Sequence, residues 1–185
     1  MRVLMIAPEP FFTPRGTPFS IRGRIQALVA LGHSVDLVTY HAGDDISLPG
    51  LRIYRTPSLP RVRSVPIGPS VTKLFLDILV FGLALIRLIR EKYDVIHTHE
   101  EAGLMGAILA PWGRAQHLYD MHSSLPQQLK NFQTCNYRPI VKCFEIMERF
   151  VVRRADAVIA ICPELLDHVA AIDRNRPCFL IENTL

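Results

Sequence analysis

Residues 2–18, with the sequence RVLMIAPEPFFTPRGTP, decide the fold class of the protein. After Arg2 the run stays apolar as far as Ala7, which is typical of a buried strand. The run is too short for the hydrophobic region of a secretory signal peptide. Thr17 fits the N-cap of a helix that carries Pro18 at its first position. The stretch therefore predicts a strand, a loop and a helix in succession, the opening unit of an α/β sheet.

Short apolar runs and longer helical patterns alternate along the rest of the chain. Further strands are predicted at 34–39, 51–55, 94–98, 117–121, 157–161 and 179–182. The helix after Thr17 stops at Gly32, and others are predicted at 70–91, 101–110, 137–155 and 163–171. This alternation predicts an α/β fold, a Rossmann-like parallel sheet with helices on both faces. Because such sheets bind ligands at the carboxyl ends of their strands, we expect functional residues at 8–17, 99–103, 122–128 and 162–164.

Length and composition indicate a globular protein. The 185 residues are enough for one α/β domain and few for two. With 49% hydrophobic and 21% charged residues the chain is not a disordered segment. The net charge of +4 permits an anionic ligand, but no dense basic stripe or nucleic-acid motif is present, so we expect no nucleic-acid partner. The four cysteines lack the spacing of a zinc site or a disulfide framework, which indicates a reducing, cytoplasmic location.

One apolar segment raises the question of a membrane. Residues 74–89 read LFLDILVFGLALIRLI, close to the length of a short membrane span, but Asp77 and Arg87 interrupt them. We predict a buried or half-buried helix, with a transmembrane helix and membrane-surface contact as alternatives. Arginines in and near the proline-rich residues 57–69 would favour an anionic membrane surface, whereas a solvated loop is the simpler interpretation.

The loop before the first helix has features of an anion site. Free N–H groups and the helix dipole favour an anion at a helix N-terminus, and Gly16 leaves the backbone open to it. Arg15, Arg22 and Arg24 cluster near this end, where the dipole disfavours cations unless an anion is bound. The alternative is a tight turn with solvated arginines. The loop matches neither the dinucleotide nor the Walker pattern.

Three histidines follow predicted strands. His97 and His99 lie on the same side of a strand and would ligate a metal only with a third residue, for which His122, Glu100 or His41 are guesses. The alternative places His97 against the sheet and His99 at its rim. His122 follows strand 117–121, so its imidazole is expected in a cleft, bonded to a sugar hydroxyl or assisting proton transfer, with a structural role as the alternative.

Several motifs, in this order, resemble the N-terminal domain of GT-B glycosyltransferases of family GT4. They are RVLMIAPEPFFTPRGTP (2–18), ALVALGHSVDLVT (27–39), DVIHTHEEAG (94–103), YDMHSS (119–124), ADAVIAICPEL (155–165) and FLIENTL (179–185). The chain departs from the family at Arg15, where many members have a second glycine, at Cys162, where serine is usual, and at Glu182, where proline is usual.

The resemblance implies a set of site residues. By position, His122 is the catalytic residue that contacts the donor sugar or the acceptor, and Asn183 lies at the domain junction. The implied donor-phosphate loop is Arg15, Gly16 and Thr17, and the implied acceptor cleft is His99, Glu100, Asp120 and Ser123. No metal ligand and no cofactor are implied.

The resemblance also implies an activity. Residues 1–185 would form the acceptor-side half of a GT-B enzyme that transfers a sugar, with retention, from a nucleotide-diphosphate sugar to an acceptor hydroxyl in cell-envelope or other glycoconjugate synthesis. Its partners would be a glycan or lipid-linked acceptor, its own C-terminal nucleotide-sugar domain, and, peripherally, the inner face of the membrane. The family's Glu-x7-Glu motif lies in that second domain and does not occur here, so the chain alone is expected to be inactive. The alternatives are a non-catalytic anion- or sugar-binding module of the same fold, and a metal-dependent hydrolase using His97, His99 and His122.

Overall fold

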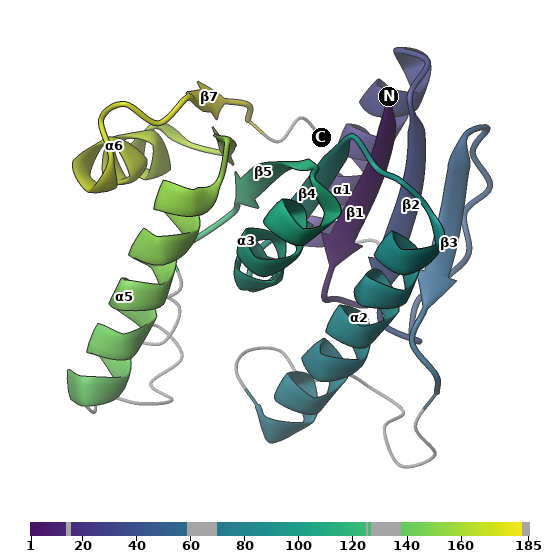
Figure 1. Ribbon diagram of the computed structural model, residues 1–185, viewed down its shortest axis with the longest axis horizontal. Coiled ribbons are helices and arrows are strands. Elements are labelled where there is room, and N and C mark those ends of the chain that lie inside the picture. The colour runs from purple at the N-terminus through teal and green to yellow at the C-terminus, as the bar shows by residue number, and fades with distance from the viewer. Residues whose placement is uncertain (14–15, 59–69, 125, 127–137, 183–185) are drawn as a thin grey trace.

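A computed structural model describes residues 1–13, 16–58, 70–124, 126 and 138–182 (Figure 1). Seven parallel strands form one sheet in the order β3-β2-β1-β4-β5-β6-β7. The strands are β1 (Arg2–Ala7), β2 (Ser34–Thr39), β3 (Leu51–Arg55), β4 (Val95–His99), β5 (Gln116–Met121), β6 (Ala157–Ala160) and β7 (Cys178–Leu180). The helices with assigned bounds are α1 (Gly16–Ala30), α2 (Val71–Arg90), α3 (Ala102–Gly113), α5 (Arg138–Arg154) and α6 (Pro163–Ile172). The predicted Rossmann-like sheet is confirmed, with boundaries shifted by a few residues at most.

The order of the strands reverses direction beside β1. The chain moves outward from β1 through β2 to β3, then returns through α2 and starts again with β4 on the other side of β1. Val3 of β1 pairs with Val35 of β2 and with Val95 of β4. The loops after β1 and β4 therefore leave the sheet in opposite directions, which opens the crevice where sheets of this type bind ligands.

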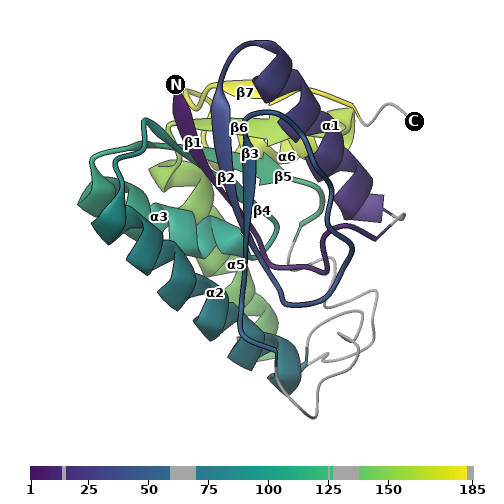
Figure 2. The same cartoon turned by 90° about the vertical axis from the view of Figure 1, so that its right-hand side faces the viewer.

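Helices cover both faces of the sheet, as Figure 2 shows edge-on. The side chains of β1 pack alternately against the helices on one face of the sheet and those on the other, because successive residues of a strand point to opposite faces. Val3 and Met5 pack with Ile21 and Ile25 of α1. Leu4 and Ile6 pack in a second cluster with residues of α2 and α3, among them Leu76, Val80 and Met105. The all-apolar character of residues 3–7 thus follows from burial on both sides.

Helix α1 begins differently from the prediction. Its first residue is Gly16, so Thr17 lies inside the first turn and is not the N-cap. Gly16 has a φ of +41°, a conformation that glycine adopts without the steric cost that a side chain brings. No atom outside its immediate neighbours lies within 4 Å of the place where a Cβ would stand, so the backbone there is open.

Helix α2 is half-buried, as predicted. Ser70 is its N-cap and accepts a hydrogen bond from the backbone N–H of Lys73 at 3.1 Å. Leu76, Val80 and Ala84 are buried against the sheet. Within the described ranges no helix is long and apolar enough to cross a membrane, so the transmembrane alternative finds no support.

A buried carboxylate organises the amino edge of the sheet. Asp36 of β2 accepts two hydrogen bonds from Arg52, at 2.7 and 3.0 Å, and one from the Tyr93 hydroxyl at 2.6 Å. Arg2 also donates to it at 3.2 Å, and Arg87 lies 3.7 Å away. Burial opposes the ionised form, but these hydrogen bonds and charges prevail and lower the pKa of Asp36. The network joins β1, β2, β3 and α2 at the edge opposite the candidate site.

Helix α3 approaches the sheet closely because two glycines face it. A Cβ at Gly106 would stand 2.6 Å from Thr98 Cγ2 of β4 and closer still to the ring of His117 of β5. A Cβ at Gly103 would stand 2.7 Å from Val151 of α5. These close contacts of Gly103 and Gly106 hold the start of α3 against the end of β4.

We expect Gly106→Ala to destabilise the chain, because the added methyl group forces α3 away from Thr98 and His117. Overpacking of this kind costs about 1–3 kcal/mol of unfolding free energy. Gly82→Ala is the matched control, since Gly82 is also helical and a Cβ there meets nothing within 4 Å. It should raise the unfolding free energy by about 0.5–1 kcal/mol through helix propensity. Urea denaturation measures both, and equal effects of the two substitutions would contradict the packing described.

Candidate active site

Polar side chains gather where β4 and β5 end. His99, the last residue of β4, pairs in register with Asp120 of β5. Ile96 of β4 points into the core under α2 and α3. Because successive residues of a strand point to opposite faces, the imidazoles of His97 and His99 lie on the other face, the one covered by α1. Asp120 shares that side, because its neighbours Tyr119 and Met121 pack into the core under α5. Both strands thus present their polar residues to one place at the carboxyl edge.

Asp120 is the centre of this group and has no exposed surface. Its Oδ2 atom lies 3.4 Å from His97 Nε2 and 3.7 Å from His99 Nδ1. Its Oδ1 atom lies 3.3 Å from His122 Nε2. Three imidazoles from β4 and the end of β5 therefore surround one carboxylate.

Arg24 of α1 supplies the positive charge that balances Asp120. Its Nε donates to Asp120 Oδ2 at 3.0 Å, and its Nη2 donates to the carbonyl oxygen of Ile181 at 2.8 Å. Arg22 lies over the ring of Phe12, with 5.1 Å between the guanidinium carbon and the ring centroid. The sequence suggested that these arginines would bind an anionic ligand. In the structure Arg24 instead forms an ion pair with Asp120, and Arg22 makes a cation–π contact with Phe12.

The histidines pack against one another and are buried. The rings of His97 and His99 stack with 4.6 Å between centroids, and His99 Nδ1 lies 3.2 Å from His122 Nε2. The side chain of His99 is 1% exposed and that of His122 is 4% exposed. The alternative that put His99 at the rim of the sheet agrees with its place as the last residue of β4, but its ring is buried there. One ligand atom from each of His97, His99 and Asp120 lies within 4.8 Å of the others, close enough to hold a metal ion.

The site keeps the carboxylate of Asp120 charged and the imidazoles of His99 and His122 neutral. Burial alone would raise the pKa of Asp120, but His97, His99 and His122 around it prevail and hold that pKa well below its usual range. Burial lowers the pKa of His99 strongly, and proximity to His97 adds to this effect. Burial is also the main cause of the lowered pKa of His122. At neutral pH the imidazoles of His99 and His122 are hydrogen-bonding groups without charge.

A second polar group joins the loops after β4 and β5. Ser123 Oγ donates to Glu100 Oε2 at 3.0 Å. Glu100 has a φ of +50°, a left-handed conformation that costs residues with a side chain roughly 1–2 kcal/mol. Strain of this kind persists where the surroundings fix the backbone, as they commonly do at binding sites. The next residue, Glu101, forms an ion pair with Lys73 at the start of α2.

The remaining predicted site residues are less closely connected. Gly16 and Thr17 begin α1, the helix that carries Arg24. Arg15 and Asn183 lie outside the described residues. Cys162 precedes α6, and the cysteines in the described ranges, Cys143, Cys162 and Cys178, are free thiols.

Two features of this edge escaped sequence reasoning. The pairing of Arg24 with Asp120 joins residues 96 positions apart, and no local pattern reveals it. Tyr40 donates to Asp77 Oδ1 at 2.5 Å, and burial raises the pKa of Asp77 to about 6. For the Tyr40–Asp77 pair the sequence did hold a signal, because Asp77 stands within an otherwise apolar helix and so needs a buried polar partner.

The chain as a whole is similar to a known protein family and to solved structures. The family model described as a glycosyl transferase 4-like domain matches residues 16–183. The sucrose-phosphate synthase (tll1590) from Thermosynechococcus elongatus is similar with a TM-score of 0.70 and 21% identity, covering 98% of this chain and 47% of that one. The catalytic domain of starch synthase IV from Arabidopsis thaliana, bound to ADP and acarbose, is similar with a TM-score of 0.63 and 14% identity, covering 97% and 51%. The chain thus spans about half the length of these structures, and identities this low show a shared fold alone. No curated protein matches the chain in sequence.

We expect the unfolding free energy to fall as the pH drops from about 6.5 towards 4. The unfolded chain protonates its histidines near an ordinary pKa of about 6.5, whereas burial lowers the pKa of folded His117 to about 4. His99 and His122 also have lowered pKa values, so the unfolded state binds more protons in this window. Each such histidine contributes up to about 1.4 kcal/mol per pH unit. Urea denaturation between pH 7 and pH 5 measures the slope. It should be smaller in His117→Gln, and a stability that rises on acidification would contradict the assignment.

Substitution at Glu100 should reveal the strain in its backbone. Glu100→Ala and Glu100→Gly both remove the bond to Ser123, but only glycine relieves the left-handed φ. We expect the glycine variant to be more stable than the alanine variant by about 1 kcal/mol in urea denaturation. The same pair of substitutions at Arg114, whose φ is +52° at the end of α3, is the matched control and should show the same difference. An alanine variant at least as stable as the glycine variant at position 100 would refute the strain.

Proposed function

The chain belongs to the glycosyl transferase 4-like domain family and has the Rossmann-like half of a GT-B fold, and on this basis we propose that it is the acceptor-side half of a retaining glycosyltransferase. The complete enzyme transfers a sugar from a nucleotide-diphosphate sugar to an acceptor hydroxyl. It is a hexosyltransferase that works in cell-envelope or other glycoconjugate synthesis.

The observation that carries the proposal is the cluster around Asp120. It lies at the carboxyl edge of the parallel sheet, on strands next to the point where the strand order reverses. Ligands of such sheets bind at that place. Within it Arg24 balances the charge of Asp120, and the neutral imidazole of His122 is a group suited to hydrogen-bonding a sugar hydroxyl.

His122 is the proposed catalytic residue. Cleavage of a glycosidic bond passes through a transition state in which positive charge develops on the sugar ring. A protonated imidazole beside that ring would oppose the reaction, and the burial that lowers the pKa of His122 prevents it. Asp120 and His99 orient the ring from within the sheet, and Glu100 and Ser123 line the acceptor side of the cleft.

The departing diphosphate binds at the start of α1 in this proposal. Gly16 exposes the backbone at the helix N-terminus, with open space where a Cβ would stand. Backbone N–H groups at such an end stabilise the negative charge that forms on the leaving group. Arg15 and Thr17 flank the glycine and complete the donor-phosphate loop. The reaction needs no metal in this scheme, because the helix end and basic side chains supply the positive charge.

A second domain completes the site in this proposal. The chain covers about half the length of the similar structures, one of which holds ADP and acarbose. We propose that the nucleotide sugar binds mainly to a C-terminal domain joined near Asn183, and that residues 1–185 alone do not catalyse transfer. The acceptor is a glycan or a lipid-linked sugar.

One observation favours a rival function. His97, His99 and Asp120 are close enough to ligate one metal ion, as a metal-dependent hydrolase requires. One contact argues against a metal site. Asp120 Oδ2 already accepts a hydrogen bond from Arg24 at 3.0 Å, so a metal ion bound to this oxygen would have to displace the buried guanidinium. Stoichiometric metal in protein purified without chelator would favour the hydrolase over the transferase.

The proposal is tested by screening nucleotide-diphosphate sugars and acceptors with the protein expressed from its complete coding sequence. His122→Gln should lower kcat by about 100-fold or more, the usual scale for a group that acts in the transition state. His33→Gln is the matched control, because His33 lies beside the N-terminus at the opposite edge of the sheet and should leave kcat unchanged. An unchanged kcat in His122→Gln would remove the catalytic role of His122. Binding of sugars without any transfer would favour the non-catalytic binding module.

A further inference from the structure

The outward side of α2 is almost wholly apolar. The exposed residues of this helix are Val71, Leu74, Phe75, Ile78, Ile86, Ile89 and Arg90. The exposed fractions of the large apolar ones range from 44% at Ile86 to 85% at Val71. At 3.6 residues per turn these six side chains fall within an arc of about 120°. The opposite arc holds the residues buried against the sheet, which are Leu76, Val80, Ala84 and Arg87.

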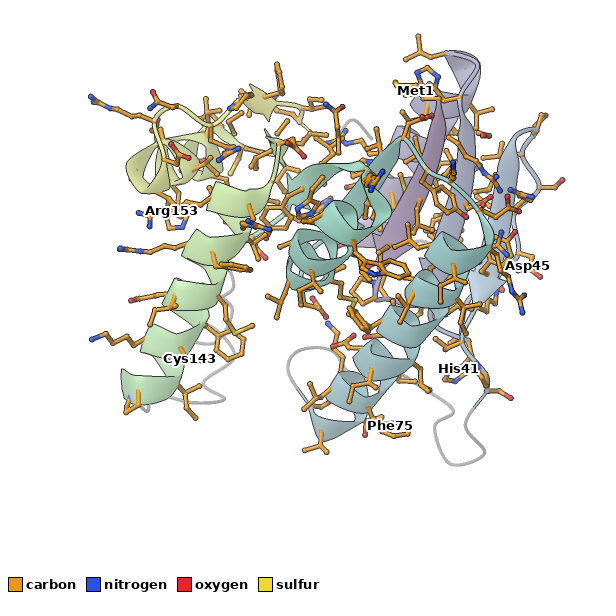
Figure 3. The ribbon with its side chains drawn as sticks, in the orientation of Figure 1. Met1, His41, Asp45, Phe75, Cys143 and Arg153 are labelled. Atoms are coloured by element: carbon orange, nitrogen blue, oxygen red, sulfur yellow. The ribbon has the colours of Figure 1, made fainter. Side chains whose placement is uncertain are left out.

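The neighbouring helix extends this surface. The exposed residues of α3 are Ile108, Pro111 and Trp112, and none carries a charge. The end of α3 lies against α2, since a Cβ at Gly113 would stand 2.9 Å from a methyl carbon of Leu88. We call the eight side chains Val71, Leu74, Phe75, Ile78, Ile86, Ile89, Ile108 and Trp112 the apolar helix face. In Figure 3 Phe75 marks one end of it on α2.

A third helix on the same side of the sheet shows that this composition is not a general property of the layer. Helix α5 exposes Ile146 and Phe150, but also Lys142, Arg149 and Arg153. Arg153 is labelled in Figure 3. Its outward side is a mixture of charged and apolar residues, as is usual for a helix facing water. Among the described residues of this layer, the outward sides of α2 and α3 are thus more apolar than that of α5.

The charges beside the apolar helix face are mainly basic. Arg90, Lys92 and Arg114 are exposed at the C-terminal ends of α2 and α3. Of the acidic residues at this end, Glu91 is paired with Arg2 and Arg87, and Asp94 accepts a hydrogen bond from the backbone of Arg2. A large apolar surface with tryptophan and basic residues at its margin matches the composition of protein segments that lie in the interface of an anionic bilayer.

We propose that the apolar helix face is a membrane-docking surface, which lies flat on an anionic bilayer with Arg90, Lys92 and Arg114 against the lipid headgroups. Helix α2, with 20 residues, is about 30 Å long and would lie in the plane of the membrane. No described helix is long and apolar enough to cross it. The inference stands on the surface of the helices and does not depend on the proposed enzymatic activity.

Trp112 allows a direct test, because it is the single tryptophan of the sequence and lies in the apolar helix face. Vesicles of phosphatidylcholine with about one third phosphatidylglycerol should shift its emission to shorter wavelength and carry the protein into the pellet on centrifugation. Vesicles of phosphatidylcholine alone should bind at least about tenfold more weakly, and 0.5 M salt, at about a 4 Å Debye length, should remove this preference.

A matched pair of double variants separates the surface from general hydrophobicity. Phe75→Gln/Ile78→Gln changes side chains that are 50% and 60% exposed on α2, and Phe150→Gln/Ile146→Gln changes ones that are 44% and 59% exposed on α5. All four residues are exposed, so both proteins should keep the far-UV circular dichroism of the parent chain. We expect the α2 variant to lose at least about tenfold in vesicle binding and the α5 variant to bind as the parent does.

Three outcomes would overturn the proposal. The first is no binding to anionic vesicles at low salt. The second is an equal loss of binding in the two double variants. The third is a concentration-dependent dimer in sedimentation that the α2 variant abolishes while vesicle binding stays absent, because the occupant of the apolar helix face would then be a second copy of the chain.

Discussion

The buried ion pair between Arg24 and Asp120 is the interaction on which the carboxyl edge of the sheet depends. A carboxylate without exposed surface is costly to ionise, and the guanidinium of Arg24 offsets that cost across the space between α1 and β5. With the charge balanced in this way, the imidazoles of His99 and His122 stay neutral. The chemistry available at this edge is therefore hydrogen bonding by uncharged rings around a fixed anion.

The two edges of the sheet use buried carboxylates differently. At the amino edge Asp36 is surrounded by three arginines, from β1, β3 and α2, and by the hydroxyl of Tyr93. At the carboxyl edge Asp120 is surrounded by imidazoles, and next to it Glu100 holds a strained backbone. Side chains that stabilise the sheet and side chains suited to bind a ligand are thus separated along the strands, as is common in parallel sheets.

Sequence patterns predicted the strands, the helices and the edge at which polar residues gather, because these follow from local apolar runs and from the rule for parallel sheets. His122 was found in this way, directly after the predicted strand 117–121, whereas Asp120, inside that strand, was implied only by the family resemblance. Arg24 was noticed for its place near a helix start, but its partner was not, since α1 and β5 meet only in the folded chain. The burial of His99 and the start of α1 at Gly16 likewise depend on tertiary packing and backbone geometry, which no residue pattern specifies.

The guanidinium of Arg24 holds two acceptors at once, the carboxylate of Asp120 and the carbonyl oxygen of Ile181, just after β7. A guanidinium is planar and rigid, so its two nitrogens keep a fixed spacing and a common plane. The end of the last strand and the centre of the candidate site are therefore coupled mechanically through one side chain. A displacement of the backbone at residue 181 therefore acts on the same guanidinium that holds Asp120, by a route separate from the hydrogen bond that joins Ile181 to Ala160 of β6.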